Sequence, residues 1–306
     1  MIEMLRTPDD RFFGLPDYAF EPNYVEVEGG RMHYVDEGEG EVILCLHGEP
    51  SWSFLYRKMI HPLKKNYRVV APDFFGFGRS DKFSKTKDYS FNMHYATLLK
   101  FLEKTDLKDI TLVVQDWGGL IGLSVLGKRP ELFKRVVIMN TSLPVGNKPM
   151  PFSFKVWQLF SRLWPTFPVS KIMKLGSFKK MDARTLQGYN APFPDKKYKV
   201  GARVWPSLVP TRPNDKGVRQ MKRAREVLSN WHKPALVMFS DKDPITKGAE
   251  KWFLNNIPSI THEPFIRIDG AGHFLQEDKG KLLAEHIHAF ILRSNEREKQ
   301  ERASLE

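Results

Sequence analysis

An acid followed at once by a tryptophan and two glycines occupies residues 116–119, near the middle of the chain. The β-branched run before it, residues 111–114, is typical of a short buried strand. A helix-like segment follows, and the glycines allow it to start close to the strand because they carry no Cβ. A strand, a sharp turn and a helix present a nucleophile at the turn. We therefore predict that Asp116 is a nucleophile.

Asp116 alone would also fit an acid that merely caps the following helix. Two later loops favour catalysis, since His273 follows the last predicted strand, and Asp241 and Asp243 follow the strand before it. The order nucleophile, acid, histidine is similar to that of the α/β-hydrolase triad. All three positions lie at carboxyl ends of strands, where open α/β sheets place their sites. We predict His273 as the base and Asp243 as its partner, because Asp243 lies a few residues into its loop.

A second loop, after an early predicted strand, carries His47, Gly48, Glu49 and Pro50. In hydrolases of this fold, such a loop gives one backbone N–H to an oxyanion hole, and the residue after the nucleophile gives the other. We expect the two donors to be the amides of Glu49 and Trp117. Glu49 would otherwise be a surface acid, but its place between Gly48 and Pro50 favours the site. His47 is expected to support the loop.

A carboxylate nucleophile selects a particular chemistry. It is ionised at neutral pH, so Asp116 can attack an sp³ carbon and form an alkyl ester without help from a base. His273, oriented by Asp243, then activates water to attack the ester carbonyl, and the oxyanion hole stabilises the charge that forms. Haloalkanes and epoxides are suitable substrates. An epoxide needs a proton donor, typically tyrosine, whereas a halide needs N–H donors such as the indole of Trp117.

The elements that position these residues alternate between strands and helices, which predicts a mostly parallel sheet with helices on both faces. The expected strands are 24–27, 32–36, 42–46, 67–71, 111–114, 136–139, 235–239 and 265–268. The alternation stops between residues 144 and 229, where Pro, Trp, Phe and Lys are frequent. We predict an α/β-hydrolase fold with a core of residues 1–143 and 230–306 and an inserted helical cap, 144–229. The charged tail, 296–306, is expected to fray.

Several stretches closely resemble the haloalkane dehalogenases. They are residues 47–53, 73–81, 115–119, 191–195 and 270–277. The resemblance is to the subfamily whose acid follows the late strand and whose halide is held by two tryptophans. It implies a hydrolase that converts a haloalkane to an alcohol, a halide and a proton. It also implies that Asp116, His273 and Asp243 are catalytic and that Trp117 binds the halide.

The resemblance places the second halide-binding tryptophan in the cap. Trp157, Trp164 and Trp205 are available there, and each would otherwise pack in the core. Trp157 lies early in the cap, as in the family, and is the predicted ligand, with Trp164 as the alternative. A sister subfamily uses an asparagine at the position of Glu49. The glutamate here supports the scheme with two tryptophans.

Two other functions compete with this prediction. Epoxide hydrolases resemble the chain in their Asp-Trp-Gly-Gly elbow and would need tyrosines in the cap, where Tyr189 and Tyr198 are present. Neither tyrosine lies in a familiar context for that role. A receptor with a silent hydrolase fold is the other alternative, and the intact predicted triad argues against it.

Composition limits the partners. The chain of 306 residues has a net charge of +12 without a nucleic-acid recognition motif, so we expect a solvated basic surface and no nucleic-acid partner. It lacks an apolar run long enough to cross a membrane, and we expect no membrane partner. A single cysteine, Cys45, and the absence of an apolar leader fit the cytoplasm. The expected partners are a haloalkane, halide and water, with no cofactor or metal, for a monomer or small homo-oligomer.

Overall fold

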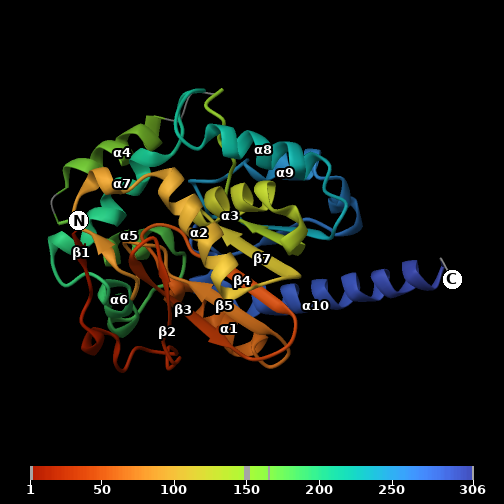
Figure 1. Cartoon of the computed structure of the whole chain (residues 1–306), viewed down its shortest axis with the longest axis horizontal. Helices are drawn as coiled ribbons and strands as arrows, with labels where there is room; N and C mark the ends of the chain where they lie inside the picture. The colour runs from red at the N-terminus through yellow and green to blue at the C-terminus, as the bar shows by residue number, and fades with distance from the viewer. Residues whose placement is uncertain (1–2, 148–151, 165, 305–306) are drawn as a thin grey trace.

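A sheet of eight strands forms the centre of the computed structural model, which describes residues 3–147, 152–164 and 166–304 (Figure 1). The strands are, in spatial order, β10 (Ile266–Ile268), β9 (Ala235–Ser240), β8 (Phe133–Met139), β7 (Ile110–Gln115), β4 (Val42–Leu46), β5 (Arg68–Pro72), β3 (Gly30–Glu37) and β2 (Asn23–Val27). The pairs from β10 to β5 are parallel, and β3 and β2 add an antiparallel edge. A separate antiparallel pair joins β1 (Met4–Leu5) to β6 (Lys82–Phe83). The predicted mostly parallel sheet is confirmed.

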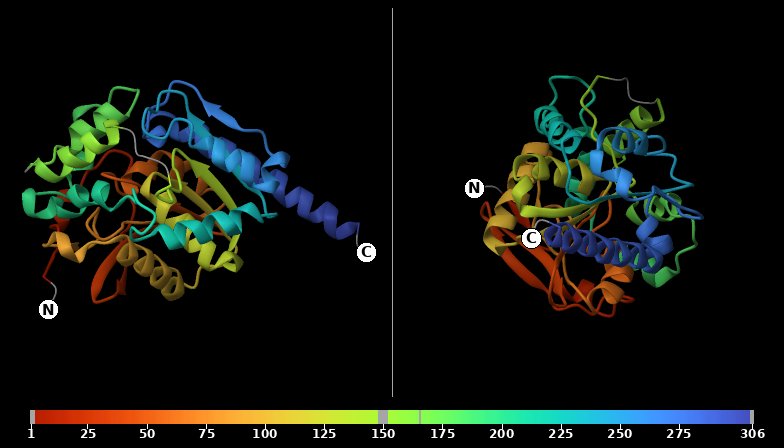
Figure 2. Two further views of the ribbon diagram at one scale, coloured as in Figure 1. Left: turned by 90° about the horizontal axis from the view of Figure 1, so that it is seen from above. Right: turned by 90° about the vertical axis from the view of Figure 1, so that its right-hand side faces the viewer.

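Helices cover both faces of the sheet, and further helices lie in the segment between β8 and β9. They are α1 (Arg57–Leu63), α2 (Phe91–Thr105), α3 (Trp117–Lys128), α4 (Phe152–Leu163), α5 (Val169–Gly176), α6 (Ala183–Asn190), α7 (Val200–Leu208), α8 (Val218–Ser229), α9 (Glu250–Asn256) and α10 (Leu275–Ala303). α1 contacts α10 on one face, whereas α3 contacts α2 and α8 on the other (Figures 1 and 2). Every residue of β7 is buried, as expected for a central strand covered on both sides.

The register of the central strands determines where the predicted site forms. Leu46 of β4 lies opposite Val114 of β7, and Gln115 of β7 lies opposite Met139 of β8. Because these strands are parallel, the segments that follow them leave the sheet at one edge. Asp116 therefore emerges close to the loop after β4 and to the end of β8.

The segment between β8 and β9 is helical, as expected, and α4–α7 gather at one end of the molecule (Figure 1). α8 lies apart from them against α3, where a Cβ on Gly127 would be 2.7 Å from the Cα of Ala224. The predicted cap, 144–229, thus includes a helix that packs on the core. We propose that the cap proper consists of α4–α7 and that α8 belongs to the α/β core.

The prediction of a frayed tail is wrong as far as Ala303, because α10 continues to that residue and projects from the body (Figures 1 and 2). Ion pairs stabilise this extension. Arg297 contacts the buried carboxylate of Glu263, and Glu298 pairs with both Lys134 and Arg302. Fraying was expected from charge alone, but here Arg297 and Glu298 have partners from other parts of the chain. Residues 305–306 lie outside the described residues.

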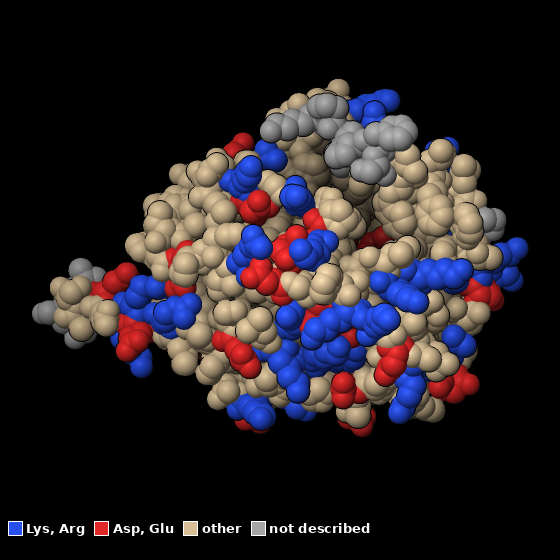
Figure 3. Space-filling model, turned by 180° about the vertical axis from the view of Figure 1, so that it is seen from behind, with Lys and Arg blue, Asp and Glu red and all other residues tan. Residues whose placement is uncertain are grey.

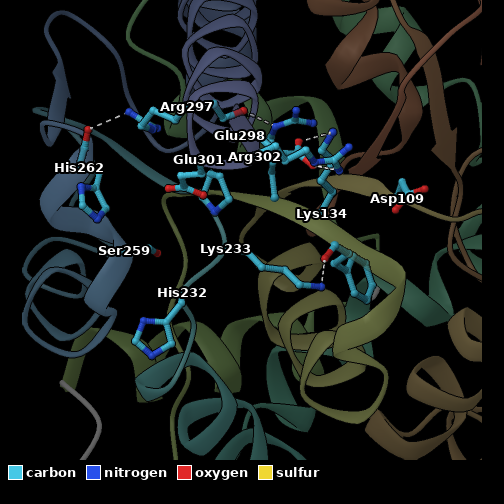
Figure 4. Close-up of a pocket in the computed structure, with 14 residues that line it drawn as sticks. Asp109, Lys134, His232, Lys233, Ser259, His262, Arg297, Glu298, Glu301 and Arg302 are labelled. Carbon is cyan, nitrogen blue, oxygen red and sulfur yellow. Dashed lines mark hydrogen bonds and ion pairs between the residues drawn. The ribbon is translucent and has the colours of Figure 1, made fainter. Parts of the chain in front are cut away.

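A cavity of about 590 Å³ lies beside the second half of α10 (Figure 4). Its lining includes Phe133, which begins β8, and Pro234, which directly precedes β9. Lys233 donates a hydrogen bond to the Phe133 carbonyl oxygen, and Arg297 donates one to that of His262. Because sites on open α/β sheets form at the carboxyl ends of strands, this cavity is at the wrong edge for the predicted chemistry.

None of the described helices is long and apolar enough to cross a bilayer.

Candidate active site

Asp116 lies directly after β7 in a backbone conformation that few residues other than glycine adopt, with φ of 50° and ψ of −123°. Its side chain makes no capping hydrogen bond to α3. The side chain of Asp116 therefore does not cap α3, which argues against the alternative role as a helix cap. A Cβ on Gly118 would lie 2.0 Å from the carbonyl oxygen of Leu46, so this position needs glycine for α3 to approach β4. The geometry is that of a nucleophile elbow.

Three of the predicted side chains come together at this elbow. His273 Nε2 lies 3.5 Å from Asp116 Oδ2, and His273 Nδ1 lies 3.0 Å from Asp243 Oδ2. Asp241 has a different place, since its Oδ1 accepts a hydrogen bond of 2.8 Å from the amide of Gly270. The structure thus places Asp243, and not Asp241, against the imidazole. This is the arrangement required of a nucleophile, a base and an orienting acid.

The loop after β4 also reaches Asp116. The Glu49 amide donates a hydrogen bond of 2.9 Å to Asp116 Oδ1. A Cβ on Gly48 would lie 2.3 Å from the same oxygen, so glycine is needed for this approach. The amide of Trp117, the other expected oxyanion donor, makes no hydrogen bond to the Asp116 carboxylate among the described contacts. Burial, followed by the charge of Asp116, holds the pKa of the Glu49 carboxyl well above its usual range, which favours its neutral form.

His47 supports this loop. Its Nδ1 lies 3.0 Å from the Gly48 carbonyl oxygen, and its Nε2 accepts a hydrogen bond from the Phe74 amide. Burial lowers the pKa of His47, and the neutral ring suits one donor and one acceptor nitrogen. Asp73 secures the same region, because its buried carboxylate accepts a hydrogen bond of 2.8 Å from the Ser53 amide. Both ring nitrogens of His47 are therefore engaged by the backbone.

The tryptophans near the elbow differ in what their indole N–H groups can do. Trp117 is buried against Trp205, with ring centroids 4.7 Å apart. Trp205 Nε1 donates to His94 Nε2 at 2.6 Å, so it is engaged within the core. Trp164 is exposed, and its Nε1 donates to Thr166. Trp157 is half-buried in the cap. Its ring packs against Phe160 and Phe167, and among the described contacts its indole N–H makes no hydrogen bond, unlike those of Trp164 and Trp205.

Comparison with known proteins decides the family. The family model for the α/β-hydrolase fold matches residues 41–280. A haloalkane dehalogenase of Mycolicibacterium paratuberculosis is 44% identical over 294 residues, which cover 94% of this chain and 97% of that protein. The chain belongs to the haloalkane dehalogenases. The structure of the tetrameric haloalkane dehalogenase DpaA from Paraglaciecola agarilytica NO2 has a TM-score of 0.87 and 38% identity, covering 93% of this chain and 97% of that one.

A more distant relative of this dehalogenase has another activity. The cis-3-alkyl-4-alkyloxetan-2-one decarboxylase of Xanthomonas campestris is 31% identical over 300 residues, covering 91% of this chain and 98% of that protein. Related chains therefore catalyse more than one reaction, and substrate choice depends on the residues of the site.

Two residues that support the site were missed in the sequence. The amide group of Asn140, directly after β8, donates hydrogen bonds to the carbonyl oxygens of Gly272 and His273 and to Ser240. Gln115, the last residue of β7, donates from Nε2 to the same His273 carbonyl at 3.2 Å. Both are polar residues at the end of an apolar strand run, which was the available signal. Together they hold the loop of His273 against the sheet.

The charge state of His273 depends on both acids. Burial alone lowers the pKa of His273, but the charge of Asp243 and hydrogen bonds with Asp116 and Asp243 raise it to about 10. The pKa of Asp243 lies below its usual range because the His273 charge and hydrogen bonds outweigh burial. The charges of the two acids therefore favour the imidazolium form of His273, and removal of either charge favours the neutral ring.

We expect Asp243→Asn to lower the pKa of His273 below its value of about 10, because the substitution removes the charge that most favours the imidazolium. Titration of the His273 ring by NMR measures this change. Asp241→Asn is the matched control and should leave the pKa of His273 nearly unchanged. Equal values in the two variants would contradict the assignment of Asp243.

Proposed function

We propose that this dehalogenase hydrolyses haloalkanes to an alcohol, a halide and a proton through an alkyl-enzyme ester. The observation that carries the proposal is the continuous contact from Asp116 through His273 to Asp243. Asp116 Oδ1 is held by the Glu49 amide, which leaves Oδ2 for attack on the carbon that bears the halogen. The new C–O bond forms as the C–halogen bond breaks, and the halide leaves with the bonding pair.

The second step uses His273 as a base. Ester formation removes the charge of Asp116, one of the groups that raise the pKa of His273, so the imidazole releases its proton more easily. It then takes a proton from water, which attacks the carbonyl carbon of Asp116. The negative charge forms on Oδ1, where the Glu49 amide already donates. Collapse breaks the bond between the carbonyl carbon and the alkoxide oxygen, the imidazolium returns its proton to that oxygen to give the alcohol, and loss of the remaining water proton restores the carboxylate.

We infer that the indole N–H groups of Trp117 and Trp157 bind the departing halide. Trp117 follows the nucleophile, and Trp157 lies on the cap helix α4. An indole N–H donates without accepting, so it suits an anion in an apolar cavity. The engagement of Trp205 with His94 and the exposure of Trp164 support Trp157 as the second donor.

The main rival, epoxide hydrolysis, needs a proton donor for its leaving oxygen, and Tyr189 is poorly suited to that role. The hydroxyl of Tyr189 is buried and donates to Glu277 Oε2 at 2.6 Å, so its proton is engaged between the cap and the core. Burial raises the pKa of Tyr189 well above its usual range, which also disfavours proton release. Tyr198, the other candidate, lies in a short 3₁₀ turn, Lys196–Lys199. These features favour a leaving group that needs no proton.

We also propose an oligomeric state and a cellular compartment for this protein. The tetrameric DpaA supports a homo-oligomer, since this chain covers 97% of its length. The single cysteine, Cys45, is a buried free thiol, which supports a reducing compartment such as the cytoplasm. No group of three or more His, Cys, Asp or Glu suited to a metal ion occurs among the described residues. The proposed chemistry needs neither a metal nor a cofactor.

A small substrate panel tests the activity. We expect bromide release from 1,2-dibromoethane and 1-bromobutane, no diol from styrene oxide and no carbon dioxide from a cis-dialkyl oxetan-2-one. The epoxide should not react because its oxygen needs a proton donor to leave, whereas a halide needs none. Halide is measured by ion chromatography and the organic products by gas chromatography. A folded protein that releases no halide from any short haloalkane would refute the proposal, and diol formation would favour the epoxide alternative.

Two substitutions separate the two steps. Asp116→Ala should lower kcat by at least about 10³-fold, because no ester can form. His273→Ala should release about one halide per active site and then stop, because the ester forms but is not hydrolysed. Rapid-quench halide assays and intact-protein mass measure the burst and the trapped alkyl group. Sustained turnover by His273→Ala would show that another group activates water.

Trp157→Phe tests the halide ligand. Loss of one N–H donor to an anion should weaken bromide inhibition of turnover by about tenfold or more. Trp164→Phe is the matched control, because its indole is exposed and bonded to Thr166, and its inhibition constant should not change. Unchanged inhibition in Trp157→Phe would remove this residue from the halide site.

A further inference from the structure

One side of the cap helix α4 is apolar and open to solvent. Val156, Leu159 and Leu163 are 49%, 53% and 62% exposed, and Trp164, directly after the helix, is 47% exposed. The three helical residues are spaced three and four apart, so they lie on one side of α4. Ser161, from another side of the same helix, is buried. A contiguous exposed apolar surface of this kind marks a place of interaction.

Positive charge borders this apolar side. Residues 140–181 contain seven Lys or Arg and no Asp or Glu. Two of them, Lys155 and Arg162, are exposed on α4 itself. Arg203 of α7 donates a hydrogen bond to the Arg162 carbonyl oxygen at 2.9 Å, which brings a further cation to this end of α4. The segment therefore offers an apolar strip with a cationic border and no acid of its own.

A second group of cations lies where the segment between α5 and α6 meets the core. Five lysines line a cavity of about 350 Å³ there, namely Lys58, Lys179, Lys180, Lys279 and Lys281. The two acids of this cavity are already engaged. Glu277 binds Arg57 and Lys58, and Asp278 accepts hydrogen bonds from backbone amides. Figure 3 shows Lys and Arg side chains as a blue band across this face, below a largely tan cap surface.

We propose that this face of the protein binds the surface of an anionic lipid bilayer, with α4 lying in the interface. An amphipathic helix with an apolar strip and a cationic border binds in this way, and tryptophan favours the same depth. Each lysine or arginine near an anionic surface adds attraction. The proposal concerns attachment to a surface and not a span, and it departs from the expectation of no membrane partner.

Other occupants fit the surface less well. A second copy of the chain would bring two positively charged surfaces together, and like charges across an interface oppose association. A nucleic acid would satisfy the lysines but leave the exposed side chains of Leu159, Leu163 and Trp164 without contacts. Only a partner that is both apolar and anionic satisfies both features.

Attachment to lipid would bring the proposed site close to substrate dissolved in the bilayer, an inference that rests on the proposed function. Small haloalkanes are apolar and dissolve in lipid. α4 carries Trp157, the inferred halide ligand, so the helix in the interface is also part of the proposed site. Lipid binding itself is independent of this consequence and is tested without any substrate.

Sedimentation with vesicles tests the binding. At low salt, we expect the whole protein to bind vesicles of equal parts phosphatidylglycerol and phosphatidylcholine, and not vesicles of phosphatidylcholine alone. Added salt should release it, because salt screens the attraction. Leu159→Gln/Leu163→Gln should weaken binding by about tenfold or more. Leu292→Gln, which changes an exposed leucine on α10, is its control and should bind like the parent.

The contribution of the α4 cations to vesicle binding is tested with a second pair of variants. Lys155→Gln/Arg162→Gln should also weaken binding by about tenfold or more. Lys104→Gln/Lys108→Gln removes the same charge from an exposed region near the end of α2 and should have much less effect. The fluorescence of Trp164 adds a local readout, because a blue shift on adding anionic vesicles should be absent in Trp164→Phe.

Several outcomes would overturn the proposal. They are no binding to anionic vesicles at low salt, equal binding to both vesicle types, and unchanged binding in the α4 variants. If the leucine variant instead converts an oligomer to a monomer and binds vesicles like the parent, the apolar side is an interface between copies. Binding of short DNA that competes with the vesicles and depends equally on the control lysines would indicate a nonspecific polyanion surface.

Discussion

The imidazole of His273 is buried between the carboxylates of Asp116 and Asp243, and the rest of the site depends on this arrangement. Burial disfavours the charged ring, so the positive form persists only because an acid lies on each side. Such a balance is sensitive to position, because the attraction between charges changes steeply over a few ångströms in a dry environment. The fold must therefore hold three segments, after β7, after β9 and after β10, in fixed relation to one another.

Several buried polar contacts provide that constraint. Asn140 joins the ends of β8 and β9 to the loop of His273, and Gln115 reaches the same loop from β7. Asp278, at the start of α10, accepts from the Gly272 amide on one side and from the Phe178 and Lys179 amides of the cap on the other. The loop that carries His273 is thus tied to the sheet and to the cap at once.

The cap is joined to the core by a second buried centre. Glu277 accepts hydrogen bonds from Arg57 and Lys58 of α1 and from the Tyr189 hydroxyl of α6. Trp52, in the loop after β4, donates to the Gly188 carbonyl oxygen of the same cap helix. α6 is therefore firmly attached to the core, whereas α4 has one side turned to solvent. This difference leaves the apolar side of α4 free for the proposed contact with lipid.

The sequence by itself determined the α/β class, the elbow at Asp116 and the group of candidates for the base and its acid. These depend on short-range patterns, namely a β-branched run, two glycines and the order of residues after successive strands. Parallel strands bring the residues at their carboxyl ends to one edge, so chain order was enough to predict that Asp116 and His273 would meet.

Only the tertiary structure decided which partners each side chain has. It placed Asp243 against His273 and Asp241 against the Gly270 amide, although the two acids lie only two residues apart after β9. It engaged Trp205 with His94 and turned Trp164 outward. It also extended α10 through ion pairs with distant residues and placed α8 on α3. Spacing along a chain specifies a face or an edge, whereas hydrogen bonds and ion pairs join residues far apart in the sequence, and these depend on how the elements pack.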